Sequence, residues 1–270
     1  PRLCSSAASD VYKRQPMCTT LPDSLEVLEK SKDHGGLVWV GLEYRYMSPI
    51  QSLIKHIEEI GDIRMLSIRE HRFPFLEKVD NWNRFNENTG GTLVEKCCHF
   101  FDLMNLIVPS KPIKVYASGG QDVNHLDEKY DGKTPDIIDN SFVIVDYQDG
   151  QRAMLDLCMF AEAGKYEQEI VLTGDQGKLE THIPGNELLL TNRKNYSLKT
   201  IEVKDDPRVK EVGFHHGASY IEHLELIDCI KNKKKPLVDC QKGLDSIILG
   251  LAAQESIQTG APVFLENFLN

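Results

Sequence analysis

The feature that most constrains the fold is a long succession of short segments in which apolar and polar residues alternate. Such alternation is typical of strands that bury one face, because successive side chains of a strand point to opposite sides of a sheet. Turn residues separate the segments, and Asp149-Gly150 is a hairpin signal between two of them. Several antiparallel strands in succession predict an open, mainly antiparallel sheet with helices on one face. The expected strands are 114–117, 139–147, 153–160, 167–172, 177–182, 187–191 and 197–203.

The residues before this succession follow another rhythm, in which helices and strands alternate. Apolar residues spaced three and four apart predict helices, and continuous or alternating apolar runs predict strands. The expected helices are 21–34, 49–60, 92–108, 219–231 and 243–259, and the expected earlier strands are 37–42 and 65–73. The chain is therefore assigned to the α/β (α+β) class.

Charge and cysteine content narrow the possible partners. The 270-residue chain has a net charge of -10, which disfavours nucleic acid because phosphate binding needs a basic surface. Its seven cysteines are odd in number and form no C-x-x-C pair, which favours reduced thiols in the cytoplasm. Cys97 and Cys98 point about 100° apart on a helix, so no metal site is expected. No apolar run reaches the roughly 20 residues that cross a membrane.

The segment 1–15 differs from the rest of the chain. It shows no helical or strand period, and it lacks the apolar stretch of a signal peptide. We interpret it as a leader foreign to the protein and leave it out of the fold prediction.

One expected helix carries the residues best suited to chemistry. After Gly90-Gly91 come Glu95, His99 and Asp102, whose spacing places them on one helical face. A carboxylate one turn before an imidazole can orient it and raise its basicity. His99 is therefore a candidate general base for the proton of an alcohol, oriented by Glu95, at the mouth of a pocket beside the strand-rich part. The alternative is an ordinary surface pair, worth about 0.2–0.5 kcal/mol.

These residues resemble a motif of the Gfo/Idh/MocA oxidoreductases, named for glucose-fructose oxidoreductase and inositol dehydrogenase. Members carry Gly-Gly, then an acidic residue, a His four positions later and usually an Asp three after that. This chain has Glu95 where Asp is commoner. Two further landmarks agree with the family, Tyr44-Arg45-Tyr46 with Pro49 at the entry to the second domain and 252–263 in the C-terminal helix.

The resemblance implies a nicotinamide-dependent dehydrogenase that transfers hydride from a carbinol of a sugar or cyclitol, or runs the reverse reduction. It implies NAD or NADP as cofactor, a small sugar or polyol as partner, and His99 as proton acceptor. By position in the family pattern, the cofactor contacts are Pro16, Tyr44 and Arg45, and Lys96 and Asp102 join the substrate contacts.

The chain departs from the family in its first part. Members carry Glu-Lys-Pro, but here Arg14 and Gln15 precede Pro16. No G-x-G-x-x-G segment for binding a pyrophosphate occurs either. We therefore expect the last helix and strand of a dinucleotide-binding domain at 16–47 and a substrate-binding and dimerisation domain at 48–270. We expect this chain alone to be an inactive fragment that binds no dinucleotide.

Other substrate contacts are expected in loops. Trp82-Asn83-Arg84 combines an aromatic face with polar groups, which suits a polyol, and His216 precedes a later helix. Both groups have the alternative of ordinary loop packing.

A second class of function stays open, a non-catalytic sheet domain for dimerisation or ligand sensing. Many strands with few helices to cover them predict an open sheet face, and hence a homodimer or a higher homo-oligomer. The pairing of His99 with Glu95 favours the enzyme.

Overall fold

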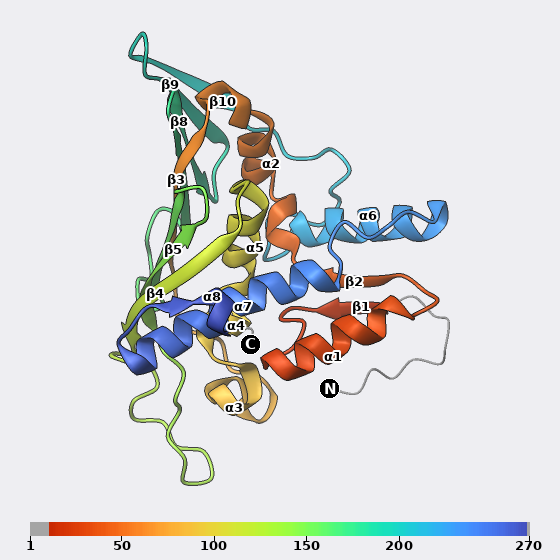
Figure 1. Ribbon diagram of the computed structural model, residues 1–270, viewed down its shortest axis with the longest axis vertical. Coiled ribbons are helices and arrows are strands. Elements are labelled where there is room, and N and C mark those ends of the chain that lie inside the picture. The colour runs from red at the N-terminus through yellow and green to blue at the C-terminus, as the bar shows by residue number, and fades with distance from the viewer. Residues whose placement is uncertain (1–10, 269–270) are drawn as a thin grey trace.

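The computed structural model describes residues 11–268, and of residues 11–14 it describes the backbone alone. A nine-stranded sheet dominates the structure, and helices α2, α5 and α7 lie along one side of it (Figure 1). A separate pair of parallel strands, β1 and β2, lies beyond these helices with helix α1. The expected α/β class and the open, mainly antiparallel sheet are confirmed.

The elements follow each other in the order that the hydrophobic pattern indicated. The strands are β1 (Val11–Arg14), β2 (Val38–Gly41), β3 (Ile63–His71), β4 (Pro112–Gly120), β5 (Asn140–Tyr147), β6 (Arg152–Cys158), β7 (Gln168–Gly174), β8 (Gly177–Ile183), β9 (Glu187–Asn192), β10 (Ser197–Glu202) and β11 (Val263–Phe264). The helices are α1 (Leu21–Lys32), α2 (Ser48–Lys55), α3 (Asn86–Thr89), α4 (Thr92–Glu95), α5 (Cys98–Ile107), α6 (Ala218–Asn232), α7 (Cys240–Thr259) and α8 (Leu265–Phe268), with 3-10 turns η1 (Glu43–Tyr46), η2 (Ile57–Ile60) and η3 (Val79–Arg84).

The large sheet has the strand order β10-β9-β8-β7-β3-β6-β5-β4-β11. Its neighbours are antiparallel except β3 and β6, which run parallel. Each strand expected from alternation is present, and Asp149-Gly150 forms the turn between β5 and β6. Strand β11 was not expected, since two residues are too few to show a period.

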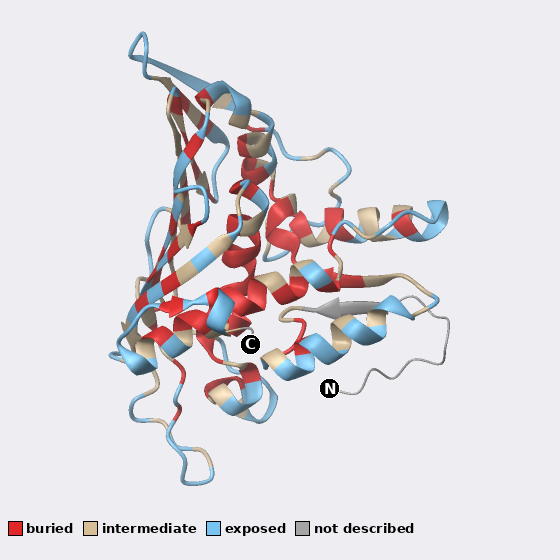
Figure 2. Ribbon diagram, viewed as in Figure 1, coloured by how far each residue is buried: buried red, intermediate tan, exposed pale blue. Residues whose placement is uncertain are grey.

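The two faces of the sheet differ in burial, because side chains alternate along each strand. Val143 and Leu155 pair across β5 and β6 and are fully buried beneath the helices. Ile144 and Met154, the next pair, are exposed on the opposite face, as is Phe142. Figure 2 shows the buried residues concentrated where α5 and α7 meet the sheet. The core therefore lies on one side of the sheet.

The segment before α1 contains a strand that the sequence did not indicate. Strand β1 pairs in parallel with β2, so Val11–Arg14 form a strand although the sequence shows no strand period there. Such pairing needs only backbone groups, and four residues are too few to show a hydrophobic period. Residues 1–10 lie outside the described residues.

The expected helix 92–108 is divided into α4 and α5. The amide nitrogens of Lys96 and Cys97 both donate to the carbonyl of Thr92, and the next regular turn begins at Cys97. Both α4 and α5 are largely buried. Tertiary packing therefore decides where one helix ends and the next begins, and the helical spacing of apolar residues does not. The division changes which side chains share a face.

Gly90-Gly91 holds this region against helix α7. Both residues have a left-handed φ, 75° and 84°, which favours glycine. A Cβ at Gly91 would lie 2.1 Å from Nε2 of Gln254 on α7, and that same nitrogen donates to the carbonyl of Gly90. The pair is therefore required by backbone geometry and close packing.

Two further findings concern the chain as a whole. Within residues 11–268, no helix combines the length and the apolar character needed to cross a membrane. No disulfide joins the described cysteines, namely Cys18, Cys97, Cys98, Cys158, Cys229 and Cys240, and Cys4 lies outside the described residues.

Candidate active site

His99 lies near the start of α5 and is the centre of a buried polar cluster. Its ring stacks on Tyr44, with centroids 4.2 Å apart and planes 11° apart. Its Nε2 lies 3.9 Å from Oε1 of Glu43, the residue before Tyr44 in η1. Its Nδ1 is buried without a hydrogen-bond partner. Tyr44 thus contacts one face of the imidazole ring and Glu43 lies near Nε2, while Nδ1 has no hydrogen-bond partner.

Glu43 is a buried carboxylate shared by two histidines. Its Oε1 also lies 2.9 Å from Nδ1 of His215, a residue in the loop before α6. Burial works against ionisation, but the charge of His99 and the hydrogen bond from His215 outweigh it and lower the pKa of Glu43 to about 2. Glu43 is therefore an anion at neutral pH.

Lys96 forms a second buried group on the far side of Tyr44. Its Nζ lies 3.0 Å from Oε1 of Glu70, which is fully buried on β3, and donates to the Tyr44 hydroxyl at 2.5 Å. Burial alone would lower the pKa of Lys96, but the charge of Glu70 and the contact with Tyr44 raise it above its usual value. Arg72 adds a further cation, 3.5 Å from the same Glu70 oxygen. Lys96 is thus a permanent cation beside His99.

The surroundings keep His99 neutral. Burial lowers its pKa to about 4, and Lys96 and His215 add to this lowering, while Glu43 opposes it. A neutral imidazole with one free nitrogen is the form that accepts a proton.

The depressed pKa of His99 predicts a stability that falls in mild acid. The unfolded chain binds this proton near pH 6.5, whereas the folded chain binds it only near pH 4. Stability is therefore complete above pH 6.5 and is lost as the pH falls towards 4, by about 2 kcal/mol at pH 5. We expect urea denaturation at pH 7.5 and 5 to show this loss. His99→Gln should reduce the pH dependence by the same amount, and an unchanged dependence in the variant would show that His99 titrates normally in the fold.

Glu95 does not orient His99, so that expectation is wrong. Its Oε1 accepts a hydrogen bond from Lys78 Nζ at 2.7 Å, and its Oε2 is buried without a partner. The break between α4 and α5 removes the regular turn that would have brought Glu95 and His99 together. The carboxylate beside His99 is that of Glu43.

Asp102 and Arg45 pair with each other. Both side chains are buried, and Arg45 Nε donates to Asp102 Oδ2 at 3.0 Å, with a second contact from Nη2 to Oδ1. Asp102 was expected at the substrate and Arg45 at the cofactor, but the bidentate pair ties η1 to α5. Each of these two charges thus has its partner within the fold.

The remaining expected residues are dispersed. Trp82 is half exposed with Lys78 Nζ 4.8 Å above its ring. Asn83 and Arg84 are buried, bonded to Leu76 and Glu128. One side-chain atom of Asn83 and one of Arg84 has no partner. Pro16 lies between β1 and α1, and His216 adjoins His215 with a left-handed φ of 50°.

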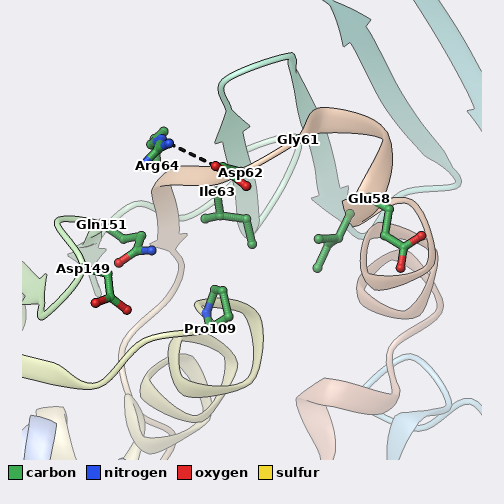
Figure 3. Close-up of a pocket in the computed structure, with 9 residues that line it drawn as sticks. Glu58, Gly61, Asp62, Ile63, Arg64, Pro109, Asp149 and Gln151 are labelled. Carbon is green, nitrogen blue, oxygen red and sulfur yellow. Dashed lines mark hydrogen bonds and ion pairs between the residues drawn. The ribbon is translucent and has the colours of Figure 1, made fainter.

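The described cavities lie elsewhere. One of about 430 Å³ lies between Gly61, Arg64 and Pro109 (Figure 3). A larger groove of about 1250 Å³ runs between α2 and the segment that follows β10. His99 lines neither, and the residue is 2% exposed. The expectation that His99 lies at the mouth of a pocket is therefore wrong for this structure, because Tyr44 and His215 pack around the ring.

Sequence reasoning missed Glu43 and Glu70, and it singled out His215 only with His216 as a loop residue that could face the pocket. Each is distant along the chain from His99, and none belongs to a motif with it. A weak signal was present, since Glu43 follows an apolar strand and Glu70 interrupts one. Among the described residues, no group of three or more His, Cys, Asp or Glu side chains is arranged to hold a metal ion.

The fold and the polar cluster define the C-terminal α/β domain of an oxidoreductase. Residues 54–265 match the oxidoreductase family, C-terminal alpha/beta domain, of the Gfo/Idh/MocA group. The chain belongs to this family.

Similar proteins agree with this assignment. The myo-inositol 2-dehydrogenase of Thermotoga maritima is 24% identical over 98% of this chain and 75% of its own length. A structure of levoglucosan dehydrogenase in complex with NADH and levoglucosan covers 95% of this chain with a TM-score of 0.81 and 16% identity, over 73% of that chain. A crystal structure of an oxidoreductase domain protein from Kribbella flavida has a TM-score of 0.80 and 17% identity to this chain. The match covers 95% of this chain and 74% of that one. At such identities the structures establish a shared fold.

Proposed function

We propose that this chain provides the substrate-binding and proton-accepting part of a nicotinamide-dependent dehydrogenase for a carbinol of a sugar or cyclitol. Hydride transfer is the chemistry that NAD or NADP supplies when bound. His99 takes the hydroxyl proton. Family membership and the dehydrogenases among the similar proteins support the reaction class.

The observation that carries the proposal is the state of His99. It is a buried, neutral imidazole whose Nδ1 has no partner, and a buried polar atom without a partner needs an explanation. A substrate hydroxyl on Nδ1 would provide one. Because His99 is 2% exposed, the proposal requires the packing around Nδ1 to open when the substrate binds.

The cofactor site is not built by this chain. It has no G-x-G-x-x-G segment, and the side chains of Tyr44 and Arg45 are engaged with Lys96 and Asp102. We propose that 16–47 is the end of a dinucleotide-binding domain, that 48–270 is the substrate and dimerisation domain, and that the chain alone is inactive, with the protein acting in the cytoplasm. The described cysteines form no disulfide, which supports that compartment.

The reaction is tested on the protein expressed from its whole reading frame. Reduction of NAD or NADP is followed with a panel of cyclitols, aldoses and anhydrosugars, with simple primary alcohols as controls. We expect turnover with polyhydroxylated carbinols only. Absence of turnover with every sugar and cyclitol in both directions would contradict the proposal. The present chain alone should show no saturable change in NADH fluorescence.

The open sheet face supports a proposed homodimer. Its exposed apolar residues lie on neighbouring strands in register, Tyr116, Phe142, Ile144, Met154 and Met65. In a symmetric dimer, this face of one copy would be buried against the same face of the other copy. A non-catalytic role in dimerisation would use the same surface.

Charge on this face should break the dimer. We expect the double variant Phe142→Glu and Ile144→Glu to weaken self-association about 100-fold, because each charge would be buried unpaired in both copies. Light scattering over a range of concentrations measures the change. Tyr196→Glu, at the exposed tip between β9 and β10, is the matched control and should not alter the mass. A wild-type chain that is monomeric at all concentrations would contradict the dimer.

A further inference from the structure

We propose that Glu43, rather than Glu95, is the positioning residue of His99, and that His215 holds the Glu43 carboxylate in place. This inference rests on the proposed function, in which His99 accepts the substrate proton. Glu43 itself touches neither substrate nor cofactor in this scheme and acts through His99.

The first support is the geometry around the His99 ring. Tyr44 stacks on the face of the His99 ring. The main motion that this stacking leaves to the ring is a roughly 180° flip about the Cβ–Cγ bond. Glu43, next to Tyr44 in η1, places Oε1 3.9 Å from Nε2. This distance exceeds a hydrogen bond, so the carboxylate acts through its charge. A negative charge at that edge favours the tautomer with hydrogen on Nε2 and leaves the lone pair on Nδ1.

The second support is that Nδ1 is the unpartnered atom. The edge that faces Glu43 and the edge that is free are opposite edges of the ring. A flip of the ring would exchange Nε2 with Cε1 and Nδ1 with Cδ2, so the Glu43 carboxylate would lose its nitrogen neighbour and Nδ1 would leave its present position. The observed orientation is thus the one in which His99 can act as a base.

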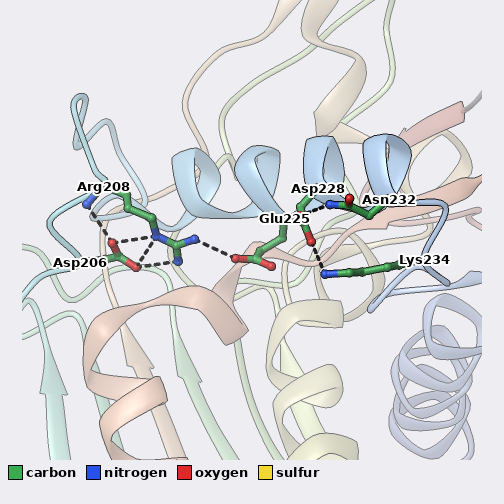
Figure 4. Close-up of polar contacts among 6 residues, drawn as sticks. All are labelled: Asp206, Arg208, Glu225, Asp228, Asn232 and Lys234. Atoms are coloured by element: carbon green, nitrogen blue, oxygen red, sulfur yellow. Dashed lines mark hydrogen bonds and ion pairs between the residues drawn. The ribbon is translucent and has the colours of Figure 1, made fainter.

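The third support is the anchoring of Glu43 from the solvent side. His215 Nδ1 lies 2.9 Å from the same Oε1 and 3.1 Å from the Ser219 hydroxyl, while the His215 side chain is 37% exposed. The loop that carries His215 is tied to α6, because Arg208 joins Asp206 to Glu225 (Figure 4). His215 therefore holds a buried carboxylate from a fixed loop.

Among the charged groups that act on His99, Glu43 is the one that can stabilise a protonated ring. Those that influence His99 are Glu43 from η1, Lys96 between α4 and α5, and His215 before α6. Glu95 is occupied by Lys78. Glu43 is the one anion of this set, so it alone favours the imidazolium that forms during the reaction.

The chemical step balances in protons and electrons. The substrate O–H bond breaks and the Nδ1–H bond forms on His99. NAD or NADP, when bound, would accept the electron pair of the carbinol C–H bond as hydride, and the carbinol would become a carbonyl group. The imidazolium then carries one positive charge beside the Glu43 carboxylate, which stabilises it.

The first test is made on this chain by NMR of nitrogen-labelled histidine and needs no cofactor. We expect His99 to carry its hydrogen on Nε2. Glu43→Gln should shift the tautomer towards Nδ1–H and lower the His99 pKa, and His215→Ala should shift the tautomer in the same direction by less. Glu95→Gln is the matched control and should leave the His99 signals unchanged. A wild-type Nδ1–H tautomer, or a response to Glu95→Gln and not to Glu43→Gln, would overturn the inference.

The second test separates this inference from the proposed function. In the whole protein, Glu43→Gln should lower kcat about 10- to 100-fold with KM little changed, and Glu43→Asp should recover part of the loss. Glu95→Gln should leave kcat within about threefold. If the wild type needs His99 and Glu43→Gln has normal kcat, the inference fails and the proposed function stands. If no sugar or cyclitol is turned over, the proposed function fails, while the tautomer measurement still decides whether Glu43 positions His99.

Discussion

Replacing His99 by alanine should lower kcat of the whole protein about 10²–10⁴-fold, the usual loss for a general base. The reason is that Nδ1 of His99 is the buried, unpartnered nitrogen of a neutral imidazole. The neighbouring Lys96 cannot take over, because Glu70 and Tyr44 hold its pKa above its usual value and keep it protonated. Steady-state turnover with the best sugar or cyclitol substrate measures the effect.

Two comparisons make this result specific. Affinity for NAD or NADP should change little, because His99 is expected to contact the substrate and not the phosphates. The matched control is His223→Ala, an exposed histidine on α6, which should keep normal kcat. If His99→Ala turns over normally while remaining folded, another residue accepts the proton and the proposed role of His99 is wrong.

Replacing Asp102 by alanine should destabilise the chain by about 3–5 kcal/mol, the cost of leaving one member of a buried ion pair unpaired. Arg45 would remain with its guanidinium buried and without its bidentate partner. The lost ion pair joins η1 to α5, and these two elements also carry Glu43, Tyr44 and His99. Urea denaturation followed by circular dichroism measures the change in the free energy of unfolding.

A double variant separates the lost pair from lost packing. Arg45→Met with Asp102→Leu removes both charges and should recover most of the stability, since apolar residues can replace a buried ion pair. The exposed pair Lys30 and Glu26 on α1 is the control, and Glu26→Ala should cost no more than about 1 kcal/mol. If Asp102→Ala instead raises KM with no change in stability, Asp102 contacts substrate as first expected.

Most of the fold could be predicted from local pattern. The alternation that predicted 139–147 and 153–160 appears as β5 and β6, because one face of each strand is buried and the period is two. The helices at 219–231 and 243–259 appear as α6 and α7. Short elements escaped prediction, since β1 and β11 are shorter than any period that a sequence can show.

The candidate site was predicted only in part. His99 is recognisable by its spacing from Gly90-Gly91, and the structure places it in a buried polar cluster. Its supposed partner Glu95 was inferred from helical periodicity, which fails where α4 and α5 are divided. Spacing predicts neighbours only while the helix is regular.

The sequence by itself determined the family, the sheet and the identity of the central histidine, because these depend on local periodicity and on residues close together in the chain. The tertiary structure alone decided that Glu43 from η1, Glu70 from β3 and His215 from the loop before α6 surround it. Those contacts join segments far apart in sequence, and they arise from how the helices pack on one face of the sheet. Burial in that packing also lowers the pKa of His99. This burial depends on residues distant in the chain, so the pattern of residues next to His99 could not predict it.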